Sequence, residues 1–232
     1  MSELPEGERG VYDLIEAVEV QLHPDRATLS RILAEADRLV ESYADSPEAH
    51  YLRGWALYHL WDHGFGAARE ALDEMRRVLR LDPSHQWALW DAVVLSARLD
   101  EDGAVIDAFM RLNRAFFTSQ DKDWRYLKAW EYALCGHLRL GHRAEFEAGL
   151  RGLVREFRKV ADDPDVILER PNQLMALYRE LRSDPCDLAS GVGRVALIDL
   201  LESQLALLVP GGWIGPQELG SAGSARESRP GS

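Results

Sequence analysis

Three segments of this chain carry one pattern: GAAREALDEMRRVL at residues 66–79, GAVIDAFMRLNRAF at residues 103–116 and GHRAEFEAGLRGLV at residues 141–154. Each begins with a glycine, and apolar residues follow it at offsets of five, nine, twelve and thirteen positions. Because an α-helix turns once in about 3.6 residues, these offsets fall on one face of a helix. In the first segment they are Ala71, Met75, Val78 and Leu79. The recurrence predicts stacked pairs of helices.

The pattern extends outward from these segments. A stretch rich in aromatic residues precedes each one, so the central helix pairs are expected over about residues 47–82, 84–117 and 122–160. Ser46 followed by Pro47 marks the first of these starts, since serine caps exposed amides and proline suits the first helical position. Helices at residues 11–22 and 27–43 form an additional pair, as do those at 172–181 and 195–209. We therefore expect an all-α protein, an α-solenoid of about five helical hairpins.

The two ends of the chain differ from its middle in composition. Residues 1–10 are acidic and turn-rich and predict a flexible N-terminus, residues 11–209 form the repeat domain, and residues 210–232, rich in glycine and serine, predict a flexible tail. Trp213 stands alone in that tail. It is expected either to dock on the end of the array or to serve as a hook for a partner.

The first repeat resembles a tetratricopeptide repeat. Its second half is similar to helix B of that family, because it has Gly66, the apolar stripe from Ala71 to Leu79 and the closing Asp82-Pro83. Its first half places Gly54 where a small residue lets two helices approach closely. The later repeats depart from the family pattern, with Gln120 and Arg158 where a proline is expected. The resemblance implies a groove that binds a peptide or a partner protein, with no cofactor and no chemistry of its own.

Charge and cysteine content narrow the classes of partner. The chain has 39 acidic against 27 basic residues, and its arginines form no evident cluster, so we expect no nucleic-acid partner and a preference for basic or neutral peptides. No apolar run is long enough to cross a bilayer. Two distant cysteines, Cys135 and Cys186, fit a reducing compartment, so the expected location is the cytoplasm. The basic residues are almost all arginine, with lysine only at positions 122, 128 and 159, which indicates a bacterial source with a GC-rich genome. The sequence predicts no oligomeric state.

Aromatic residues gather on the first helices of the pairs, which line the concave side in tetratricopeptide proteins. Rigid aromatic side chains with arginine are common at binding hot spots. The expected contact residues for a partner are therefore Tyr51, Arg53, Trp55, Tyr58, His59, Trp90, Arg98 and Trp130. The alternative for several of these aromatics is packing between helices.

Two short patterns keep an enzyme or a metal protein open as the alternative function. Arg80 and His85 have the spacing of an arginine–histidine motif in HEPN-type ribonucleases, which are also all-helical, although a repeat boundary explains the same residues. His59 and His63 lie one helical turn apart and could share a zinc ion, but no third ligand accompanies them. The sequence therefore favours a non-catalytic scaffold without metal or cofactor.

Overall fold

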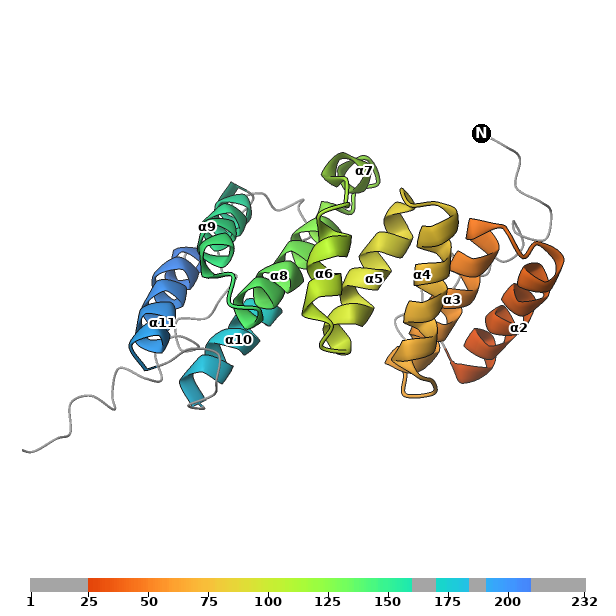
Figure 1. The fold of residues 1–232 in the computed structure, drawn as a ribbon, viewed down its shortest axis with the longest axis horizontal. Helices are drawn as coiled ribbons and strands as arrows, with labels where there is room; N and C mark the ends of the chain where they lie inside the picture. The colour runs from red at the N-terminus through yellow and green to blue at the C-terminus, as the bar shows by residue number, and fades with distance from the viewer. Residues whose placement is uncertain (1–24, 160–169, 184–190, 210–232) are drawn as a thin grey trace, which may run out of the picture. The chain divides into compact units, whose positions relative to one another are not determined.

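The computed structural model describes residues 25–159, 170–183 and 191–209, and within these ranges the protein is all-α (Figure 1). The described residues form ten α-helices, α2 to α11, and one short 3-10 helix, η1. None of the described helices is both long and apolar enough to span a membrane. The expected helix at residues 11–22, the N-terminal segment 1–10 and the tail with Trp213 lie outside the described residues.

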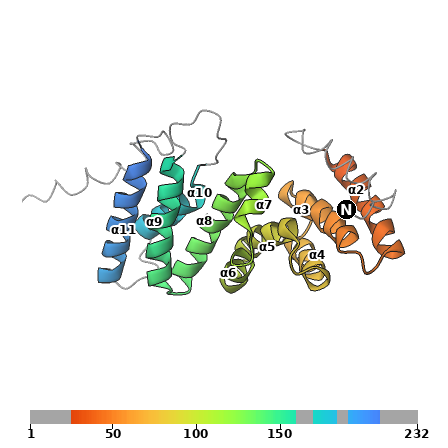
Figure 2. The ribbon, with the colours of Figure 1, turned by 90° about the horizontal axis from the view of Figure 1, so that it is seen from above.

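The chain divides into two compact units, with the boundary after Ser119. The helices of the first unit are α2 (Arg26–Ser42), α3 (Pro47–Asp62), α4 (Ala68–Leu81), α5 (Gln86–Arg98), α6 (Asp102–Phe109) and α7 (Arg114–Ser119). From α2 to α6, each helix packs against the one that follows it, which gives four consecutive pairs. In the second unit, α8 contacts α9 and α10, and α11 contacts α9 and α10 (Figure 2). Its helices are α8 (Asp123–Arg139), α9 (Arg143–Lys159), α10 (Asn172–Ser183), α11 (Gly191–Leu205) and η1 (Ala206–Leu208).

The start of α3 follows the predicted boundary. The hydroxyl oxygen of Ser46 accepts a hydrogen bond from the amide of Ala49 at 3.2 Å, and Pro47 occupies the first helical turn. The same kind of cap begins α2, where Asp25 Oδ1 accepts from the amide of Thr28 at 2.7 Å. Local side chains therefore set these two helix starts, of which the sequence analysis predicted the cap at Ser46.

The second central pair differs from its prediction, because residues 102–119 form two helices instead of one. The amide of Asn113 donates to Oε1 of Gln86 at 2.7 Å, and the Asn113 side chain accepts from the amide of Ala115 at 3.0 Å. These bonds lie in the turn between α6 and α7. The turn lets Phe116 and Phe117 both pack edge-on against Trp87. The predicted stripe position Ala115 is consequently exposed.

Close contact between helices depends on glycine in both units. A Cβ atom on Gly54 of α3 would lie 2.8 Å from Cε of Met75, which confirms the close approach predicted for this residue. In the second unit the glycines lie on α9: a Cβ on Gly152 would lie 2.9 Å from the ring of Trp130 on α8. Trp130 therefore packs between α8 and α9.

A buried ion pair joins α8 to α10. Nζ of Lys128 donates to Oε2 of Glu131 and to the carbonyl oxygen of Arg170, both at 2.8 Å, and Oε1 of Glu131 accepts from the amide of Leu174 at 2.8 Å. Glu131 is 1% exposed, and burial raises its pKa, an effect that Lys128 and the amides of α10 oppose. The pair thus supplies an acceptor for the first turn of α10, where no helical partner exists.

Candidate functional site

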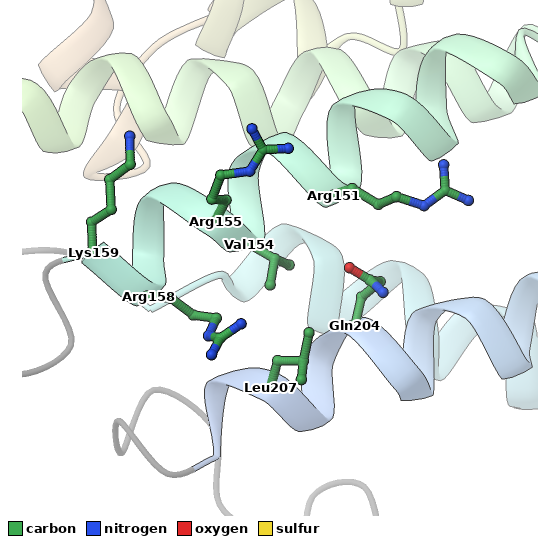
Figure 3. A pocket seen from close by; sticks show the side chains of 7 residues that line it. All are labelled: Arg151, Val154, Arg155, Arg158, Lys159, Gln204 and Leu207. Atoms are coloured by element: carbon green, nitrogen blue, oxygen red, sulfur yellow. The ribbon is translucent and has the colours of Figure 1, made fainter.

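A pocket of about 360 Å³ lies between α9 and the segment formed by α11 and η1. Its lining combines apolar and basic side chains: Val154 and Leu207 are apolar, Gln204 is neutral, and the other residues are Arg151, Arg155, Arg158 and Lys159 (Figure 3). In Figure 3, Val154 and Arg158 extend from α9 towards Gln204 and Leu207, whereas Arg151 and Arg155 point away from these two residues. We refer to these seven residues as the basic pocket.

The amphipathic character of α9 places the basic residues together. Its buried face carries Phe146, Leu150, Leu153, Val154 and Phe157. Arg151, Arg155 and Arg158 follow each other at spacings of four and three, which aligns them on one side of the helix. The helix can therefore bury its apolar stripe only by turning these arginines outward.

The charges of the basic pocket are only partly balanced. Arg151 lies 3.3 Å from Oε2 of Glu147, and Lys159 lies 2.7 Å from Oε1 of Glu156. Among the described residues, neither Arg155 nor Arg158 makes a hydrogen bond or an ion pair. Like charges held close on one helix repel each other, so an anionic group that enters the pocket would gain most from Arg155 and Arg158.

This cluster corrects the expectation that the arginines are dispersed. The net charge of −12 hides it, because the total says nothing about where charges lie. The signal that sequence reasoning missed is the spacing of Arg151, Arg155 and Arg158 within a predicted helix. The contribution of Gln204 and Leu207 depends on how α11 and η1 pack on α9, and no local pattern contains it.

Some of the predicted aromatic contact residues are buried in the core, and others are partly exposed. Tyr51, Trp55 and Trp90 are between 4% and 8% exposed and belong to the core of the first unit. Tyr58 and His59 are half-buried, and the ring of His59 lies 4.1 Å from that of Trp55, measured between centroids. Trp130 lies in the second unit and packs on α9, as described above. The partly exposed members of this set are therefore Tyr58, His59 and Trp130.

The two predicted arginine anchors also differ. Arg53 is held by carboxylates: its Nε donates to Oδ1 of Asp37 at 2.7 Å, and its guanidinium also bonds Glu74. Burial by itself would lower the pKa of Arg53, but the hydrogen bond that it donates to Asp37 and the charge of Glu74 raise this pKa above its ordinary value. Arg98, at the end of α5, is exposed.

The residues of the two alternative functions have local structural roles. Nδ1 of His85 accepts a hydrogen bond from the amide of Ala88 at 3.1 Å, so this buried histidine caps α5, while Arg80 is exposed on α4. His63 caps the C-terminus of α3 through its amide, which donates to the carbonyl oxygen of His59 at 3.1 Å. Within the described residues, no group of three or more His, Cys, Asp or Glu side chains could hold a metal ion.

Comparison with protein-family models, with curated proteins and with solved structures finds no match to this chain. The basic pocket and the helix packing are therefore the observations from which a function can be argued.

Proposed function

We propose that this protein is a non-catalytic helical scaffold of the cytoplasm, and that it binds an acidic segment of a partner protein in the basic pocket. The observation that carries the proposal is the pair Arg155 and Arg158, which has no partner among the described residues and borders an apolar floor. Guanidinium groups suit carboxylates because they donate two parallel hydrogen bonds. Val154 and Leu207 offer contact for an apolar side chain in the same segment.

Size and charge favour a short acidic protein segment over a nucleic acid. A volume of about 360 Å³ accommodates a few side chains. The chain as a whole carries a net charge of −12, so a long polyanion that extends beyond the pocket meets repulsion. A segment with two or three carboxylates on an otherwise neutral partner avoids that repulsion.

We infer that the hairpins are divergent tetratricopeptide-like repeats within an α-solenoid of about five hairpins. The glycine at position 54 with its close contact to Met75 supports this inference. So does the alternation in the second unit, where α8 packs on α10 and α9 on α11.

A second contact region remains part of the proposal. Tyr58 and His59 are half-buried and Arg98 is exposed, whereas Arg53, which is also partly exposed, is held by Asp37 and Glu74. Tyr58, His59 and Arg98 would extend the contact area with a larger partner, and replacing Tyr58 by alanine tests them separately.

Fluorescence anisotropy of the full chain with a labelled peptide tests the basic pocket. The probe is a short peptide in which glutamates surround two leucines, and a second peptide carries glutamine in place of each glutamate. We expect the glutamate peptide to bind and the double variant Arg155→Glu, Arg158→Glu to weaken it at least about tenfold, since one charge-assisted hydrogen bond is worth roughly 1.5–3 kcal/mol.

The control variant is Arg31→Glu with Arg80→Glu, which changes the net charge by the same amount at two exposed arginines of the first unit. Equal weakening by both double variants would mean that only net charge matters and would contradict the pocket. Equal affinity for the two peptides would also contradict it. Stronger binding of a single-stranded oligonucleotide than of the glutamate peptide would replace the protein partner by a nucleic acid.

A further inference from the structure

Two histidines face each other at the turn between α8 and α9. Nδ1 of His137 lies 3.3 Å from Nδ1 of His142, and the ring centroids are 5.5 Å apart. His137 belongs to the last turn of α8, and His142 precedes α9 directly. The pair is at the opposite end of α9 from Arg158 and Lys159, so it is separate from the basic pocket.

The backbone holds this pair in place. Gly141 has a φ of +77°, a backbone conformation that residues other than glycine rarely adopt. Its amide donates to the carbonyl oxygen of Leu138 at 3.0 Å, and the amide of His142 donates to that of His137 at 2.8 Å. These two bonds define a Schellman motif, in which the side chains at the positions of His137 and His142 come into contact.

The turn between α3 and α4 has the same motif and serves as an internal comparison. Gly64 has a φ of +81°, its amide donates to the carbonyl oxygen of Trp61 at 2.8 Å, and that of Phe65 donates to Leu60 at 2.7 Å. The equivalent side chains there are Leu60 and Phe65, the apolar pair that usually accompanies the motif. In the α8–α9 turn, the same backbone instead presents two nitrogen atoms that can bind a metal.

We propose that His137 and His142 form a zinc-binding site, with one Nδ1 ligand from each imidazole. Zn–N bonds of about 2.0–2.1 Å in tetrahedral geometry place two ligand nitrogens roughly 3.3–3.4 Å apart, which agrees with the separation in this turn. His142 is exposed, so a small rotation of its ring can direct both lone pairs to one ion. The rigid turn would reduce the entropy lost on binding.

The surroundings suit a cation. His137 is partly buried and His142 lies beside it, and both effects lower the pKa of His137. The carboxylate of Glu145 acts in the opposite direction on that pKa, which places a negative charge within electrostatic reach. Because the described residues hold no group of three or more ligands, water or another solvent ligand completes the coordination.

A hydrogen bond between the two imidazoles is the competing explanation for their separation. It requires a proton on one Nδ1, whereas the zinc site requires a lone pair on both. The two explanations therefore predict different responses of the same atoms to added metal.

The test is a titration of the full chain, purified without a histidine tag, with ZnCl₂ at neutral pH. Isothermal calorimetry gives the affinity, and long-range ¹H–¹⁵N correlation spectra identify the nitrogen atoms that bind. We expect saturable binding that moves the Nδ1 signals of both residues. His142→Gln should weaken it at least about tenfold, because even changes beyond the ligands typically cost 10–100-fold.

The matched control is His59→Gln with His63→Gln, the histidine pair at the end of α3, which should leave zinc affinity unchanged. Gly141→Ala keeps both imidazoles but strains the turn, and it should weaken binding if the motif positions the ligands. Since His142 is exposed, its variant should fold normally, as circular dichroism would verify. Absence of saturable binding, or binding unaffected by His142→Gln, would overturn the proposal.

Discussion

α4 and α9 occupy the same place in their helical hairpins, yet they treat their basic residues differently. On α4, the guanidinium groups of Arg69 and Arg76 both bond the carboxylate of Glu101, at the start of α6. On α9, Arg155 and Arg158 meet no such carboxylate among the described residues. Both helices bury the apolar stripe predicted from the sequence, including Met75 on one and Leu150 on the other.

The difference shows which helix has its arginines paired with carboxylates of a neighbouring helix and which does not. Glu101 forms ion pairs with both Arg69 and Arg76, so the arginines on that face of α4 have a partner within the first unit. On the equivalent face of α9, Arg155 and Arg158 keep positive charge that a bound anionic group would neutralise. Substitutions that remove or add a counter-charge should therefore have opposite effects in the two regions.

The largest expected effect on stability comes from breaking the buried ion pair between Lys128 and Glu131 in the second unit. Glu131→Ala leaves Lys128, only 7% exposed, without its carboxylate and removes the acceptor of the Leu174 amide. We expect a loss of roughly 3–5 kcal/mol in the free energy of unfolding, measured by urea denaturation. The double variant Lys128→Met, Glu131→Leu should recover much of the loss; failure of Glu131→Ala to destabilise would contradict the buried pair.

The next largest effect is expected where a glycine allows close packing of two helices, at Gly152 on α9 and at Gly54 on α3. Gly152→Ala places a methyl group 2.9 Å from the rigid ring of Trp130, while Gly54→Ala places one 2.8 Å from the flexible end of Met75. We expect Gly152→Ala to cost about 1–3 kcal/mol of unfolding free energy, as overpacking does, and Gly54→Ala to cost less. Thermal denaturation of both variants measures the order, and the reverse order would show that Trp130 can move aside.

A smaller effect should follow from removing the carboxylate that satisfies α4. Glu101→Gln should cost about 0.5–1 kcal/mol in the free energy of unfolding, because the pairs are partly exposed. The hydrogen bond from Arg69 and the charge of Arg76 lower the pKa of Glu101, so the carboxylate stabilises the fold above its ordinary pKa and loses this effect as the pH falls through the lowered value. The difference between wild type and variant should therefore disappear in acid.

The smallest effect should have the opposite sign. Arg155→Gln with Arg158→Gln removes two of the four neighbouring positive charges, so the free energy of unfolding should stay equal or rise by about 0.2–0.5 kcal/mol. Arg69→Gln on α4 should instead lower it, because that arginine has a partner. A clear loss of stability in the α9 variant would mean that these arginines are satisfied within the protein and would weaken the binding proposal.

The sequence predicted much of the fold because helix signals are local. Ser46 and Pro47 marked a helix start, and α2 and α10 lie close to their predicted ranges. The division of residues 102–119 was not predictable, because the bond between Gln86 and Asn113 joins residues that are distant in the chain. The burial of Trp55 and Trp90 was equally open, since an aromatic residue suits both a core and a binding surface.

By itself, the sequence determined the helical class and the buried stripes of α4 and α9, because a period of about 3.6 residues acts over short distances. It also determined the start of α3, because the preferences of serine and proline at a helix start are local. It also contained the alignment of Arg151, Arg155 and Arg158 on one helix. Only the tertiary structure decided which charges have partners. Glu101 reaches two arginines of α4, while the packing of α11 and η1 on α9 forms a pocket around arginines without a counter-charge among the described residues, and such pairings depend on distances between helices.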